Sequence, residues 1–149
     1  MSADRPRFGP AAGSKRLRLT LAYDGGPWRG WQSMPGGGTV QDMLNEAFFK
    51  VAGMPVRTQG SGRTDAGVHA LAQVAHADVP ESASLAPEAW RNALNACLPP
   101  SIRVLDVDEP PQPFHARFDA LGKIYRYRIW RGRELDPFEI GRASCRERV

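Results

Sequence analysis

The sequence of 149 residues lacks a long apolar run and contains only two cysteines. No stretch approaches the roughly 20 apolar residues of a membrane-spanning helix, and no signal-peptide pattern precedes the first regular element. These absences predict a cytoplasmic protein without membrane contact. A disulfide is not expected either, because Cys97 lies at a helical core position and Cys145 in a terminal stretch without periodicity.

Familiar ligand-binding motifs are also absent. There is no P-loop and no dinucleotide fingerprint, and residues 36–38 form an isolated glycine run. His69 and His76 occur close to Asp65 and Asp78, but one histidine belongs to a loop and the other to a strand. No short pair of ligands results, so the sequence predicts no metal site.

The charge balance is basic. The chain has 20 lysines and arginines against 16 acidic residues, a net charge of +4 and a pI near 9.5, which suits a polyanionic partner. For each basic residue on or beside a predicted strand, contact with RNA phosphates and a solvated strand face are equally good interpretations. These residues are Arg16, Arg18, Arg117, Lys123, Arg126, Arg128, Arg131 and Arg133.

Hydrophobic periodicity predicts a small α+β domain. Alternation predicts strands at residues 16–23, 55–60, 71–79 and 102–108. Helical spacing predicts one helix between Thr39 and Gly53 and a second from Pro87 to Cys97. The order β-α-β-β-α-β is that of a ferredoxin-like fold, an antiparallel sheet with both helices on one face. A further strand is expected at 124–131, where apolar and basic residues alternate.

A glycine-rich loop at residues 59–67 carries one carboxylate, Asp65, and one guanidinium, Arg63. An arginine two residues from an aspartate can keep it ionised against the desolvation of a pocket. An ionised, partly dehydrated carboxylate can act as a nucleophile. Taken alone, however, an aspartate in such a loop is better explained as the stabiliser of its own turn.

The residues around Asp65 extend this pattern. Gly-Arg-Thr-Asp-Ala-Gly-Val-His-Ala at 62–70 resembles the active-site signature of the TruA-type tRNA pseudouridine synthases. Further segments match that family in order, and the resemblance covers about residues 16–138. They are Tyr-Asp-Gly at 23–25, Gly-Trp-Gln at 30–32, Thr-Val-Gln at 39–41, the helix end at 92–99, Phe-His-Ala-Arg-Phe at 114–118 and Lys-Ile-Tyr-Arg-Tyr at 123–127.

The resemblance implies an isomerase that converts uridine to pseudouridine in the anticodon stem-loop of tRNA, at tRNA positions 38 to 40. Such an enzyme cuts the N-glycosidic bond, turns the uracil and rejoins it through carbon 5, which requires no cofactor. The fold implied is one half of a pseudouridine synthase. A homodimer is implied for the full-length family, and the sequence leaves open whether this chain forms it.

The resemblance also assigns roles to residues. Asp65 matches the catalytic nucleophile, and Arg63 matches the arginine that pairs with it and helps hold the flipped base. Whether the aspartate first adds to the ribose or begins as a base stays open. Tyr125 matches the tyrosine that stacks on uracil, with core packing as the alternative. Three residues are expected to contact RNA or support the site: His115, Arg117 and Arg126.

The ends of the chain are interpreted separately. Residues 1–15 are expected to be a disordered leader, 16–138 the synthase domain, and 139–149 a non-native tail, with the natural gene continuing from about Glu139. Half of the family's cleft would then be missing, so weak RNA binding and little or no turnover are expected. The alternative function is a ferredoxin-like RNA-binding module without chemistry, which would carry aromatic pairs on its central strands.

Overall fold

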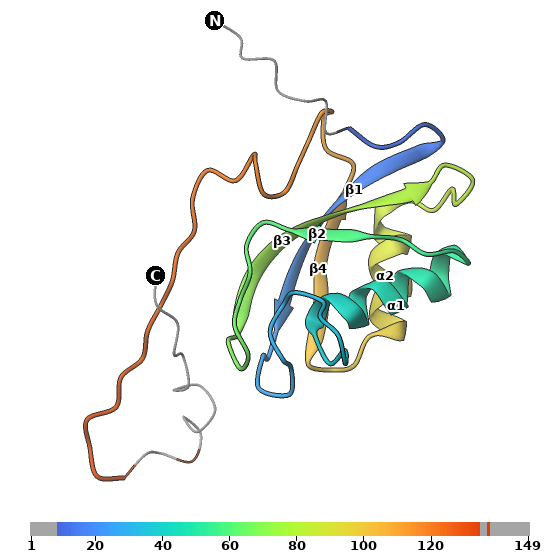
Figure 1. Ribbon diagram of the computed structural model, residues 1–149. Helices are drawn as coiled ribbons and strands as arrows, with labels where there is room; N and C mark the ends of the chain where they lie inside the picture. The colour runs from blue at the N-terminus through green and yellow to red at the C-terminus, as the bar shows by residue number, and fades with distance from the viewer. Residues whose placement is uncertain (1–8, 135–136, 138–149) are drawn as a thin grey trace, which may run out of the picture.

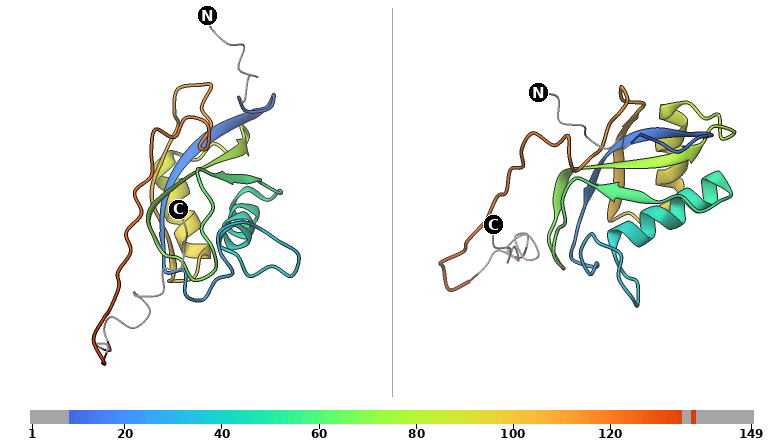
Figure 2. Two further views of the ribbon diagram at one scale, coloured as in Figure 1. Left: turned by 60° about the vertical axis from the view of Figure 1, so that its left-hand side comes forward. Right: turned by 45° about the horizontal axis from the view of Figure 1, so that its top comes forward.

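The computed structural model describes residues 9–134 and 137. Its elements, labelled in Figure 1, are β1 (Ser14–Tyr23), α1 (Val40–Ala52), β2 (Thr58–Gly60), β3 (Ala70–Pro80), α2 (Pro87–Cys97) and β4 (Ile102–Asp108). The strands form an antiparallel sheet in the order β2-β3-β1-β4. Both helices lie against the same face of this sheet (Figure 2). The predicted ferredoxin-like α+β architecture is therefore confirmed.

The core lies between the sheet and the helices. Leu17, Leu19 and Leu21 alternate along β1 and are completely buried, because every second side chain of a strand faces the same side. Phe48 of α1 and Trp90 of α2 meet above them with ring centroids 5.7 Å apart. None of the helices in the described part of the chain has the length and apolar character needed to cross a membrane.

The ends of α1 follow from local sequence. Thr39 accepts a hydrogen bond from the Asp42 amide and Asp42 accepts one from the Thr39 amide, which completes a capping box. Gly53 ends the helix in the left-handed conformation at φ 73°. Both ends agree with the predicted helix. By contrast, β1 begins at Ser14, two residues before the predicted start, because Ser14 pairs with Pro80 across the sheet.

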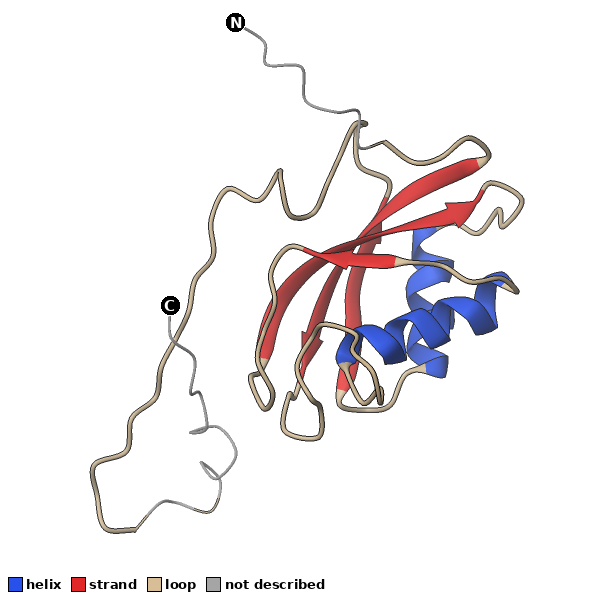
Figure 3. Cartoon of the chain, in the orientation of Figure 1, coloured by secondary structure: helices blue, strands red, loops and turns tan. Residues whose placement is uncertain are grey.

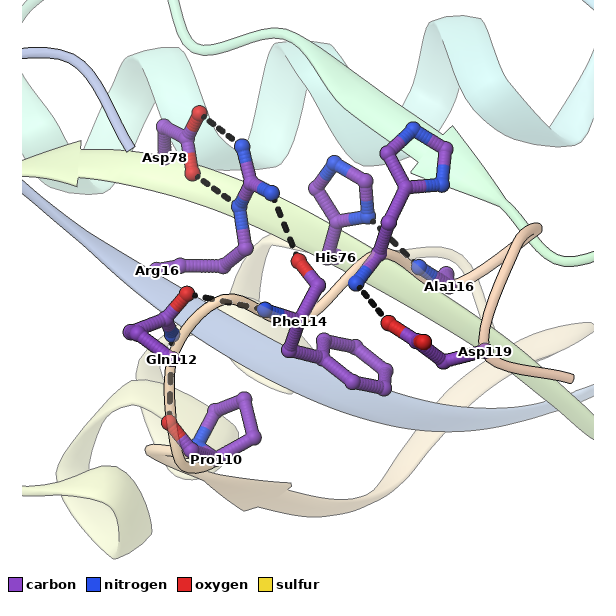
Figure 4. Close-up of polar contacts among 9 residues, drawn as sticks. Arg16, His76, Asp78, Pro110, Gln112, Phe114, Ala116 and Asp119 are labelled. Carbon is purple, nitrogen blue, oxygen red and sulfur yellow. Dashed lines mark hydrogen bonds and ion pairs between the residues drawn. The ribbon is translucent and has the colours of Figure 1, made fainter. Parts of the chain in front are cut away.

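A proline-rich stretch, residues 110–119, covers the sheet face opposite the helices and is called the covering segment. Figure 4 shows how it is attached. Arg16 of β1 donates to both carboxylate oxygens of Asp78 on β3, at 2.6 and 2.7 Å, and to the Phe114 carbonyl at 2.6 Å. His76 of β3 accepts a hydrogen bond from the Ala116 amide at 3.0 Å. The covering segment is thus tied to the two central strands.

The predicted fifth strand is wrong for this structure. Residues 121–134, called the trailing segment, form no strand and run away from the sheet as an extended loop (Figure 3). Ile124 and Ile129 are 97% and 81% exposed. An alternating sequence becomes a strand only where a neighbouring edge supplies hydrogen bonds, and neither β2 nor β4 pairs with this segment.

The predicted boundaries at the chain ends lie largely outside the described residues. The leader falls on residues 1–15, of which 1–8 are outside, and the tail on 139–149 lies wholly outside. Residues 9–13 precede β1 without regular structure, and Ser14 and Lys15 already belong to the sheet.

Candidate active site

The loop that carries the predicted nucleophile joins β2 to β3. Residues 61–69, called the signature loop, lie beside residues 24–33, the loop that leaves β1. Backbone hydrogen bonds connect the two: the Trp31 amide donates to the Thr64 carbonyl at 3.0 Å, and the Gly67 amide donates to the Trp28 carbonyl at 3.3 Å. The signature loop is therefore held along its length by a second loop.

Close approach of the two loops depends on Gly30. Its φ is +90°, a conformation that residues with a Cβ rarely adopt. A Cβ at this position would also lie only 2.7 Å from the Thr64 carbonyl oxygen. Any side chain at position 30 would push the loops apart, which explains a glycine here.

The inner side of the signature loop is anchored to the sheet. Tyr23 of β1 and Thr64 share a hydrogen bond of 2.7 Å between their hydroxyls. Gln73 of β3 accepts from the Ser61 hydroxyl at 2.9 Å and donates to the Gly62 carbonyl at 2.5 Å. These contacts fix the backbone from behind, while the side chains of Arg63 and Asp65 are exposed.

Asp65 presents a free carboxylate. The turn at 65–68 is closed by its backbone carbonyl, which accepts from the Val68 amide at 3.1 Å. Its carboxylate forms no hydrogen bond or ion pair with any residue that the structure describes. The side chain therefore does not stabilise its own turn, which was the alternative explanation from sequence.

Arg63 does not pair with Asp65 in this structure. No ion pair joins the two within residues 9–134. Both side chains are exposed to solvent, where an ion pair contributes only about 0–1 kcal/mol and nothing holds the partners together. The predicted pairing of Arg63 with Asp65 is thus not formed in this structure, and the role of Arg63 at the site stays a prediction.

Tyr125 of the trailing segment forms no interaction with Asp65. Its ring is 42% exposed and forms no hydrogen bond or ring contact with another described residue. Lys123, two residues earlier, does reach the signature loop, because its side chain lies directly over Gly62. Sequence reasoning placed Lys123 only among the basic residues and in a matching segment, and its contact with Gly62 was missed.

The sequence that contains this loop matches a known family. The model of the tRNA pseudouridine synthase family matches residues 22–119. The chain belongs to the tRNA pseudouridine synthase family. The family match begins near the end of β1 and ends with the covering segment, so it includes Arg63, Asp65, His115 and Arg117.

Relatives from three bacteria support the same family. The tRNA pseudouridine synthase A of Akkermansia muciniphila is 54% identical over 128 residues, which are 86% of this chain and 48% of the relative. That of Solidesulfovibrio magneticus is 56% identical over 77% of this chain and 42% of its own length. That of Solibacter usitatus is 50% identical over 84% and 51%. The chain spans about half the length of the curated relatives it matches.

Two residues that were predicted to contact RNA, His115 and Arg117, form contacts within the fold. His115 packs against His76 with ring centroids 4.6 Å apart, and its Nδ1 accepts from the Arg117 amide at 3.2 Å. Burial, and then the nearby Arg16, lowers the pKa of His115. Arg117 lies 5.9 Å from the Phe118 ring centroid. His115 and Arg117 therefore help to shape the covering segment.

Two of the basic strand residues form ion pairs with aspartates. Arg16 is 6% exposed and bound to Asp78, as described above. Arg18 donates to both carboxylate oxygens of Asp108, and this pairing raises the pKa of Arg18. Both arginines hold the sheet together. Arg126, in contrast, is exposed on the trailing segment.

The polar neighbours of the signature loop include one more histidine. The His69 Nδ1 accepts from the Gly25 amide at 3.0 Å and lies 3.1 Å from an Asp24 carboxylate oxygen. This contact joins the end of the signature loop to the loop that leaves β1. Within the described ranges there is no cluster of three or more His, Cys, Asp or Glu side chains placed to hold a metal ion.

Proposed function

We propose that the whole protein isomerises uridine to pseudouridine in tRNA, with Asp65 as its nucleophile. The observation that carries this proposal is the free carboxylate of Asp65 on a loop whose backbone is anchored by β1, β3 and a neighbouring loop. A nucleophile needs an unoccupied lone pair, which the unpartnered carboxylate offers, and the anchored loop backbone limits where that carboxylate can lie. The family match and the names of the relatives support the same reaction.

The chemistry is an isomerisation. The bond between the ribose C1′ and uracil N1 breaks, and a bond from C1′ to C5 forms after the base has turned. N1 gains a proton and C5 loses one, so no redox partner or cofactor is required. The base must leave the RNA stack to turn on its sugar, so the site must be open enough to admit a flipped nucleotide. The exposed position of Asp65 meets that requirement.

Arg63 and Tyr125 complete the proposed site. Arg63 would pair with Asp65 once RNA displaces water from the loop, because an ion pair strengthens as the local dielectric falls. Tyr125 would stack on the uracil after the trailing segment moves toward the signature loop. The contact of Lys123 with Gly62 supports this movement, since it already holds one end of the segment at the loop.

The finer assignments follow from the same proposal. The substrate would be the anticodon stem-loop at tRNA positions 38 to 40, the full-length protein would be a homodimer, and the reaction would occur in the cytoplasm. His115, Arg117 and Arg126 are proposed to contact RNA at the border of the site. Because the chain spans about half of its relatives, we propose that it has little or no turnover by itself.

The test is a substitution in a completed chain. Residues 16–134 would be joined to the remaining part of the Akkermansia muciniphila relative, which is 54% identical over the shared region. Release of tritium from tRNA labelled at uridine C5 measures turnover, and fluorescence anisotropy measures tRNA affinity. Asp65→Asn should abolish release while changing the Kd for tRNA less than about twofold. A non-catalytic RNA-binding module would show no release in either chain.

A further inference from the structure

The Lys123 side chain lies over Gly62 of the signature loop, and its charge has no acidic partner among residues 9–134. We propose that the Lys123 ammonium over Gly62 binds one backbone phosphate of the RNA strand that enters the site. This inference rests on the proposed function, because it names the part of the tRNA that this side chain contacts. Lys123 would be a substrate-binding residue, since it touches the strand and not the reacting atoms.

Gly62 makes the position of Lys123 possible. The φ of Gly62 lies outside the left-handed region, so its backbone would accept any residue. A Cβ there would, however, overlap the Lys123 Nζ and lie 3.0 Å from its Cε. The Gly62 carbonyl is fixed from behind by Gln73. The missing side chain therefore makes room for the lysine on a rigid surface.

The charge of Lys123 is unused within the fold. The other two lysines of the chain are paired: Lys15 with Glu109 and Lys50 with Glu46, each at 2.8 Å. Lys123 forms no ion pair or hydrogen bond with a residue in the described ranges. A lysine that lies against the loop but lacks an acidic partner is suited to an anion from outside the chain.

The surroundings of Lys123 favour a phosphodiester. In the described part of the chain, the amides of Gly62, Arg63 and Asp65 donate no hydrogen bond. Backbone amides are common donors to phosphate oxygens in nucleic-acid complexes. The Asp65 carboxylate, in contrast, repels a phosphate, because both groups are negatively charged. The cations of Lys123 and Arg63 would offset that repulsion. A strand held by its phosphate can present a flipped base to Asp65.

The test is the salt dependence of tRNA binding by this chain. A fluorescent, unmodified tRNA transcript would be titrated by anisotropy between about 50 and about 200 mM KCl. Each lost phosphate contact lowers the slope of log K against log salt by about 0.7–0.9. Lys123→Gln should therefore show a roughly threefold smaller loss of affinity over this range than the unchanged chain. Lys123→Arg should keep the original slope.

Two further variants make the result specific. Lys50→Gln removes the same charge from the exposed surface of α1 and should leave the slope unchanged. Gly62→Ala should reduce the slope as much as Lys123→Gln, because its methyl group displaces the flexible end of the lysine. The double variant should have the same slope of log K against log salt as either single variant, since both substitutions remove the same phosphate contact.

Three results would overturn the phosphate contact of Lys123. If Lys123→Gln and the unchanged chain have the same slope, the phosphate contact is wrong and the proposed function is unaffected. A reduction of equal size in Lys50→Gln would also overturn the assignment, because it would then reflect net charge alone. If the unchanged chain shows no salt-dependent binding to tRNA, the phosphate contact is overturned, whereas the RNA substrate of the proposed function is tested separately by tritium release from the completed chain.

Discussion

The most quantitative prediction concerns His76, which connects the covering segment to β3. Its side chain is 6% exposed, and its Nδ1 accepts a hydrogen bond from the Ala116 amide, which requires that nitrogen to be unprotonated. Burial, with smaller contributions from Arg16 and His115, lowers the pKa of His76 from 6.5 to about 4. A proton on His76 is therefore disfavoured in the folded state.

The lowered pKa of His76 makes the unfolding free energy depend on pH. In the unfolded chain the imidazole titrates near its ordinary pKa of 6.5, so between pH 6.5 and 4 the unfolded state binds more protons than the folded state. The contribution of His76 to stability is complete above about pH 6.5 and falls as the pH approaches 4. The difference between the two pKa values corresponds to about 3 kcal/mol of unfolding free energy.

The perturbation is His76→Gln. Glutamine retains an oxygen that can accept from the Ala116 amide but does not titrate. Urea denaturation at pH 7 and at about pH 4.5 would measure the unfolding free energy of both chains. The unchanged chain should lose about 2 to 3 kcal/mol more than the variant over this range. Parallel losses in the two chains would refute the buried, neutral histidine, because all other titrating groups are shared.

Three other predictions concern the ion pair between Arg16 and Asp78 and the residues of the signature loop and its neighbour. Asp78→Ala should lower the unfolding free energy in urea by about 3 kcal/mol, because it leaves the buried Arg16 without its ionic partner; a loss below about 1 kcal/mol would contradict that pairing. Gly30→Ala should lower the unfolding free energy by more than about 1 kcal/mol. It should also speed hydrogen exchange of the Trp31 amide, which donates to the Thr64 carbonyl, and unchanged exchange would contradict the close approach of the two loops. Asp65→Asn should change stability by less than about 0.5 kcal/mol, since the carboxylate has no contact in the described fold, and a larger loss would indicate a turn-stabilising role.

Much of the fold could be predicted because its signals are local. Alternation along β1, the capping box at Thr39 and Asp42, and the left-handed Gly53 each depend on residues within a few positions of one another. Such signals determine where elements begin and end. The order of these elements then limits the topologies to a few, of which the ferredoxin-like sheet is one.

The remaining features depend on contacts between distant residues. From sequence alone, Arg16 and Arg18 could contact either phosphates or solvent. Their actual partners, Asp78 and Asp108, could not be found from sequence because they are 62 and 90 positions away. The fifth strand was predicted from alternation at 124–131, but a strand also needs an adjacent edge. The position of Lys123 over Gly62 likewise requires the fold, since no local pattern joins residues 61 positions apart.

The candidate site was found in sequence for a different reason. The segment at 62–70 resembles the family's active-site signature over nine residues, but its three-dimensional geometry could not be predicted from sequence. The structure adds that the loop is anchored through Tyr23 and Gln73 and that the Asp65 carboxylate is free. These two facts argue against an aspartate that serves its own turn, and they are consistent with the proposed role of Asp65 as the nucleophile.

The most direct measurement of the central claim is tritium release from C5-labelled tRNA by the completed chain and its Asp65→Asn variant. The substitution conserves shape and removes the charge. The account predicts release by the unchanged chain and none by the variant, with tRNA affinity preserved within about twofold. Release by the variant at the rate of the unchanged chain would contradict the assignment of Asp65 as the nucleophile.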